Sequence, residues 1–166
     1  MHKSKILWTL LVLSSPVFAH EEDEHKPVLS TESKSASVSP ATLAGLKETY
    51  MRSIEPIFEA KCYDCHSDKT HYPWYYKIPG VKQYIDSDIA EAREHLDLSK
   101  GFPFVSKHEI DHDLEDIGDE VGEGEMPPKA YTFIHRDTKL SPEERQTILN
   151  WVKTSRDAIK TDAMPK

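Results

Sequence analysis

The feature that most constrains this chain is the pentapeptide Cys-Tyr-Asp-Cys-His at positions 62–66, which contains the only two cysteines among 166 residues. In a helical turn, residues at positions i, i+3 and i+4 share one face, so Cys62, Cys65 and His66 are expected to lie together. Two thiols at this spacing can each add to a vinyl group of one haem, and the imidazole can then bind the iron. The pattern therefore predicts covalent attachment of one c-type haem, with His66 as the proximal ligand.

Three other uses of the cysteine pair compete with this interpretation. A redox-active C-x-x-C is expected after a strand in a βαβ unit, and the chain shows no such pattern. A structural zinc site normally takes four ligands, and there is no second cysteine pair. A disulfide between Cys62 and Cys65 could form in an exported protein, but it leaves His66 without a role. Haem attachment accounts for all three residues.

The composition points to a thin core. Hydrophobic residues make up 37% of the chain, and even with the 6 Gly residues added the share stays below the usual value of about 45–50%. A haem would fill space that side chains leave open. Charged residues make up 30%, and the formal net charge is −8. This acidic balance argues against nucleic acid as a partner, because phosphate backbones are bound by clustered Lys and Arg.

The first 19 residues have the organisation of a secretory signal peptide. A basic start, MHKSK, is followed by the apolar run ILWTLLVL and by SSPVFA, which places small residues before a cut after Ala19. The apolar run is much shorter than the roughly 20 residues needed to span a bilayer. An uncleaved anchor is the less favoured alternative. The expectation is an exported periplasmic protein that does not span the membrane once the signal is cleaved.

Residues 20–40 are predicted to be a flexible leader, and residues 41–166 the folded domain. The leader is rich in acids, Ser and Pro and nearly free of aromatic residues, so it cannot bury enough apolar surface to order itself. His20 and His25 stand among its acids and could bind a divalent metal ion, although a solvated tail is the simpler interpretation.

The folded part is predicted to be all-α. Apolar residues recur at helical spacing from 43 to 58, where Pro56 is expected to kink or restart the helix. Further amphipathic helices are predicted over 79–99 and 106–125, the second of them stopped by Gly122 and Gly124. A last helix is expected after Ser141, with Pro142 in its first turn and Glu144 completing a capping box. No alternating pattern typical of strands competes with these helices.

The chain resembles the small single-haem "haem-binding domain" proteins, which are relatives of cytochrome c found in the bacterial periplasm. The residues that carry the likeness are KCYDCHSDKTHYPWYYKIPGV, REHLDLS and GEMPPKAYTFIHRDTKLSPEERQTILNW, between Tyr50 and Val152. The long last segment is more distinctive than C-x-x-C-H. The resemblance implies a small cytochrome c-like domain whose helices wrap one haem, with a Met-Pro loop closing the far side.

Met126 is the predicted sixth ligand of the iron. It lies in GEGEMPPKAY, where glycines and prolines forbid a helix and favour a rigid loop, and it is 60 positions beyond His66. Met/His ligation raises the reduction potential of a haem. Two alternatives stay open: Met126 only packs in the loop, or His135 is the ligand. His135 is expected instead to hydrogen-bond locally or to contact a propionate.

Trp74 follows Pro73 in an aromatic stretch. Packing in the core is the default for such a residue, and a hydrogen bond from its indole to a haem propionate is a second prediction.

These residues predict an electron-transfer protein that works with a redox partner in the periplasm or inner membrane, because filled axial positions leave no place for a substrate. The alternative is a haem enzyme or gas sensor, peroxidase-like or binding carbon monoxide or nitric oxide, in which Met126 is absent from the iron or easily displaced.

Overall fold

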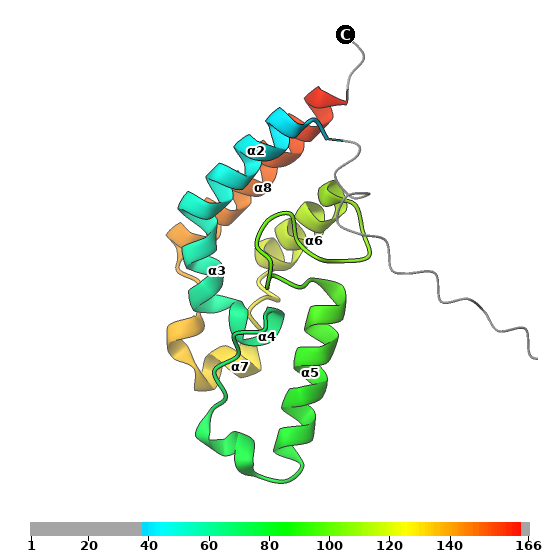
Figure 1. Ribbon diagram of the computed structural model, residues 1–166. Coiled ribbons are helices and arrows are strands. Elements are labelled where there is room, and N and C mark those ends of the chain that lie inside the picture. Colours follow the sequence, from blue (N-terminus) through cyan, green and yellow to red (C-terminus); the bar gives the residue numbers. More distant parts are fainter. Residues whose placement is uncertain (1–37, 164–166) are drawn as a thin grey trace, which may run out of the picture.

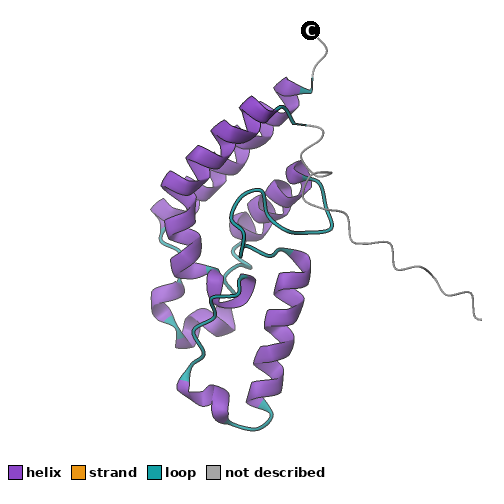
Figure 2. Ribbon diagram, in the orientation of Figure 1, coloured by secondary structure: helices purple, strands orange, loops and turns teal. Residues whose placement is uncertain are grey.

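A computed structural model describes residues 38–163 of the chain, and these residues form helices joined by loops (Figures 1 and 2). Within that range the one β-type pairing is an isolated bridge between Asp97 and Val105. The predicted all-α class is therefore confirmed. The elements are α2 (Pro40–Thr49), the π-helical turn η1 (Tyr50–Ile54), α3 (Glu55–Lys61), α4 (Tyr63–His66), the 3-10 turn η2 (Trp74–Lys77), α5 (Val81–His95), α6 (Ile110–Glu123), α7 (Lys129–Ile134), the 3-10 turn η3 (Arg136–Thr138) and α8 (Pro142–Asp162).

The predicted signal peptide and almost all of the predicted leader, including His20 and His25, lie outside the described residues. The described part begins just before the expected boundary at residue 41. Val38 is buried, and the Ser39 hydroxyl accepts a hydrogen bond from the Thr42 amide at 3.3 Å, which caps the start of α2.

Pro56 changes the form of the first helical stretch but does not end it, because residues 40–61 stay helical. It lies in the first turn of α3, directly after the π-helical turn Tyr50–Ile54. A proline inside a helix removes one amide donor and its ring clashes with the carbonyl four residues earlier. The wider π-helical turn accommodates the proline, and α3 continues in line with α2 (Figure 1).

Helices α6 and α8 pack on each other, and α2 lies alongside α8 (Figure 1). The apolar residues at helical spacing on α6 are all buried: Ile110, Leu114, Ile117 and Val121. On α8, Ile148, Trp151 and Val152 are buried and Leu149 is half-buried. One detail of the prediction is wrong: Gly122 lies within α6. The helix ends at Gly124, which takes a left-handed conformation with φ 76° that suits glycine.

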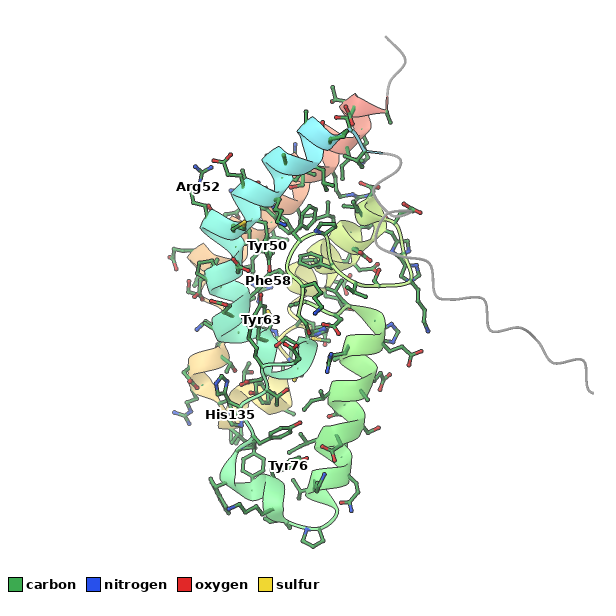
Figure 3. The ribbon with its side chains drawn as sticks, in the orientation of Figure 1. Tyr50, Arg52, Phe58, Tyr63, Tyr76 and His135 are labelled. Carbon is green, nitrogen blue, oxygen red and sulfur yellow. The ribbon has the colours of Figure 1, made fainter. Side chains whose placement is uncertain are left out.

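The interior of this half of the molecule is an aromatic cluster. Its members, drawn from α2–α3, the loop after α5 and α8, are Tyr50, Phe58, Phe102, Phe104 and Trp151, with ring centroids 5.3–6.4 Å apart. Figure 3 shows Tyr50, Phe58 and Tyr63 in succession along the inner side of these helices. Large rings bury much area per residue. The part of the molecule built around α3 and α8 therefore has a side-chain core despite the polar composition of the chain.

The start of α8 provides a test of the predicted capping box. The Ser141 hydroxyl accepts from the Glu144 amide at 3.1 Å, and the Glu144 carboxylate accepts from the Ser141 amide at 2.7 Å. Replacing Ser141→Ala should lower the free energy of unfolding by about 1 kcal/mol. Thermal melting followed by circular dichroism measures it. The control is Ser87→Ala, at an exposed position of α5. Equal melting temperatures of the two variants would contradict the capping role.

Candidate functional site

The Cys-Tyr-Asp-Cys-His segment forms a single helical turn at the end of α3. The carbonyl of Cys62 accepts from the Cys65 amide at 3.2 Å and from the His66 amide at 3.0 Å. Between the cysteines, Tyr63 is buried and its hydroxyl lies 3.4 Å from that of Tyr50, which anchors the turn to the aromatic core. The two cysteines are free and half-buried. The spacing therefore places both thiols and the imidazole on one anchored turn.

The imidazole of His66 is oriented by the chain that follows α5. Its Nδ1 donates to the carbonyl oxygen of Leu96 at 2.9 Å, and the His66 carbonyl accepts from the Leu98 amide at 2.7 Å. A carbonyl oxygen can only accept, so the proton is on Nδ1 and the lone pair is on Nε2. Burial lowers the pKa of His66, which favours the neutral ring. A neutral imidazole held through Nδ1–H is the usual arrangement of a histidine that binds a metal through Nε2.

The two thiols differ from those of a redox-active pair. Burial raises the pKa of Cys62 to about 12, and the neighbouring Cys65 adds to the shift. Burial also raises the pKa of Cys65, and the nearby carboxylate of Asp64 acts in the same direction. Catalytic dithiols have a lowered pKa in electropositive surroundings, so this site does not favour thiolate exchange. Within residues 38–163, no group of three or more His, Cys, Asp or Glu side chains is placed to hold a metal ion.

Helix α5 lies beside this turn and has an apolar stripe. The other described residues cover that stripe only in part. The stripe predicted from the sequence lies on a real helix, which packs on α4 and η2, yet no residue of α5 is fully buried. Val81, Ile85, Ile89 and Ala92 of α5 are all half-buried, and so is Leu96, which directly follows the helix. Figure 1 shows α5 in the opposite half of the molecule from α2 and α8. An apolar stripe, two free thiols and an oriented imidazole together fit a haem.

Met126 is held firmly by its backbone. Its amide donates to the Glu120 carbonyl at 3.2 Å at the end of α6, and Pro127 and Pro128 restrict the chain before α7 begins. The half-buried side chain lines a cavity of about 730 Å³ between the end of α6, α7 and the start of α8. None of the residues of the Cys-Cys-His turn lines this cavity. The predicted loop is present, and ligation by Met126 stays a prediction.

Trp74 does not pack in the core. It lies in η2 with 81% of its surface exposed, and its ring contacts Tyr75 edge-on at 5.7 Å. The default expectation of core packing is therefore wrong, because the short turn after Pro73 points this ring outward. The predicted hydrogen bond to a haem propionate stays a prediction. His135 forms a hydrogen bond with a residue 60 positions away rather than a local one: its Nε2 lies 2.5 Å from the Tyr75 hydroxyl.

Sequence reasoning missed the role of Asp64, the second residue between the cysteines. Its carboxylate accepts from the Tyr131 hydroxyl of α7 at 3.0 Å and from the His71 amide at 2.9 Å. A carboxylate between the two thiols was the available signal, but its partners lie 7 and 67 positions away.

Comparison with known proteins identifies the family of the chain. The sequence profile of the haem-binding domain family matches residues 24–154. The chain belongs to this family. The match includes the Cys-Cys-His turn, α5 and the Met126 loop, so it covers every part of the candidate site.

The haem-binding domain is also similar to the cytochrome c peroxidase Ccp of Escherichia coli (strain K12), with 35% identity over 100 residues. This match covers 59% of the present chain and 22% of the peroxidase. The chain thus spans about a fifth of the length of that relative. No solved structure matches the present chain. Family membership and this likeness together support haem binding.

Proposed function

We propose that the chain carries one haem c, attached through Cys62 and Cys65 and ligated by His66, and that it transfers electrons. The observation that carries the proposal is the hydrogen bond from His66 Nδ1 to the Leu96 carbonyl. It puts the ring proton on Nδ1 and leaves the basic lone pair on Nε2, and His66 shares its turn with two free thiols. When bound, haem supplies an iron that changes its charge by one electron.

The remaining residues hold that group and keep its surroundings constant. Tyr63 anchors the attachment turn in the core, and the stripe on α5 offers apolar side chains to the macrocycle. Met126 is proposed as the second axial ligand, since its loop is fixed at both ends. A thioether ligand favours ferrous iron and raises the reduction potential. If His66 and Met126 both held the iron, a substrate would find no open position on it, and electron transfer is the chemistry that such a site would support.

The place of action that we propose is the periplasm, with another redox protein there or in the inner membrane as the partner. The organisation of residues 1–19 supports export. No helix among residues 38–163 is long and apolar enough to cross a bilayer.

A second candidate function is peroxide reduction at an open iron. The likeness to a cytochrome c peroxidase favours it. The placement of Met126 also allows it, because the cavity that Met126 lines is separate from the Cys-Cys-His turn. The two functions differ in whether a ligand occupies the sixth position.

The coordination of the iron distinguishes them. The exported chain is produced with a cytochrome-maturation system, and its spectra are recorded in the oxidised and reduced states. Electron transfer predicts a near-infrared sulfur-to-iron band in the oxidised protein and little reaction of the reduced protein with carbon monoxide. Rapid carbon monoxide binding together with steady consumption of peroxide would instead support the enzyme.

A further inference from the structure

Asp64 is the centre of a network that joins three segments distant in the sequence. Its Oδ2 accepts from the Tyr131 hydroxyl at 3.0 Å. Its Oδ1 accepts from the His71 amide at 2.9 Å, and the Nδ1 atom of the His71 ring lies 3.2 Å from the same oxygen. A single carboxylate on the attachment turn thus contacts both the loop that follows it and helix α7.

The network continues from α7 into the aromatic stretch. The rings of Tyr131 and His135 stack with centroids 4.4 Å apart and planes at 23°. His135 in turn lies 2.5 Å from the Tyr75 hydroxyl. Tyr131 of α7 and His135, the residue directly after the helix, are therefore both joined to the segment 64–75. Other residues of α7 line the cavity that Met126 also lines: Lys129, Thr132 and Phe133.

Helix α7 also fixes the loop that carries Met126. Pro127 and Pro128 are the only residues between Met126 and α7, and their rings leave the backbone few conformations. On the other side, the Met126 amide is hydrogen-bonded to the end of α6. A displacement of α7 therefore moves the Met126 loop, and whatever holds α7 against the attachment turn also limits that movement.

We propose that Asp64 and Tyr131 are positioning residues that hold the Met126 loop at a set distance from the haem attachment turn. This inference rests on the proposed ligation by Met126. A hydrogen bond from a phenol to a carboxylate is of the charge-assisted kind, and the bond from Tyr131 to Asp64 joins the attachment turn directly to α7. It connects the two sides from which the iron would be ligated, independently of the iron itself.

The test compares Tyr131→Phe and Asp64→Asn with the unchanged protein, each produced with its haem. Tyr131→Phe removes only the hydroxyl and keeps the ring that stacks on His135. The control is Tyr84→Phe, because Tyr84 is 68% exposed on α5. In both test variants the fraction of reduced protein that binds carbon monoxide rapidly should rise about 10-fold or more, while the sulfur-to-iron band weakens. The melting temperature of each variant shows whether it is still folded at the temperature at which carbon monoxide binding is measured.

A double variant adds a second criterion. If Asp64 and Tyr131 act through each other, the pair of substitutions should have no larger effect than the stronger single one. Hydrogen exchange of the amides at 129–135 should be faster in Tyr131→Phe than in the Tyr84→Phe control.

Two results must be distinguished. Absence of the sulfur-to-iron band from the unchanged protein would refute Met126 ligation, and hydrogen exchange of α7 would then decide the link alone. A normal band and unchanged exchange in both test variants would overturn the positioning role while leaving the proposed function intact.

Discussion

Replacement of both Cys62 and Cys65 by alanine should abolish covalent haem completely while the helices around the aromatic cluster stay folded. The thiols are the two groups that we propose to attach the haem. The rings of Tyr50, Phe58 and Trp151 contact one another directly, and Cys62 only packs against the edge of this core as a half-buried residue. Far-ultraviolet circular dichroism and acidic extraction of the haem measure the two effects.

The single variants are the matched controls for this experiment. Cys62→Ala alone and Cys65→Ala alone should each retain haem through the remaining thioether. The double variant should also melt at a lower temperature than the unchanged protein, since a bound group that favours the folded state stabilises it. A double variant that kept its haem through acidic extraction would contradict attachment at these residues. Complete loss of helical signal would contradict an independent aromatic core.

Met126→Ala should leave the haem attached but open the sixth position of the iron. The sulfur-to-iron band should disappear, carbon monoxide should bind the reduced protein rapidly, and the reduction potential should fall because the thioether favours ferrous iron. Met51→Ala is the control, since Met51 lies on η1 with 54% of its surface exposed.

A surviving sulfur-to-iron band in Met126→Ala would refute Met126 as the ligand. If a sixth ligand remained without that band, His135 would be the next residue to replace, because it was the rival in the sequence and now lies beside Tyr75. Met126→Ala and its control Met51→Ala both keep Cys62, Cys65 and His66. A difference between their spectra therefore reports on the sixth ligand of the iron.

The helices could be predicted from the sequence because their signals are local. The stripe from Val81 to Leu96 repeats at helical spacing, and Ser141 with Glu144 forms a capping box that the structure contains. Pro56 likewise marks the point where the α-helix widens to a π-helical turn just before it. The error at Gly122 has a local cause as well, since only the backbone conformation shows that Gly124 is the residue with positive φ.

The aromatic core and the Asp64 network could not be predicted in this way. Phe102 and Phe104 lie in a loop without periodicity, and they are buried by contacts with Tyr50 and Trp151 far along the chain. Trp74 shows the reverse case: an apolar ring expected inside is exposed by the turn that carries it. Such placements depend on how distant segments meet, which single residues do not encode.

The mass of the exported, denatured chain tests the central claim most directly. Made beside a working cytochrome-maturation system, the protein should have the mass of the polypeptide beginning at His20 plus one haem, and the haem should stay with the chain after denaturation. A colourless chain with the mass of its amino acids alone would contradict covalent attachment through Cys62 and Cys65.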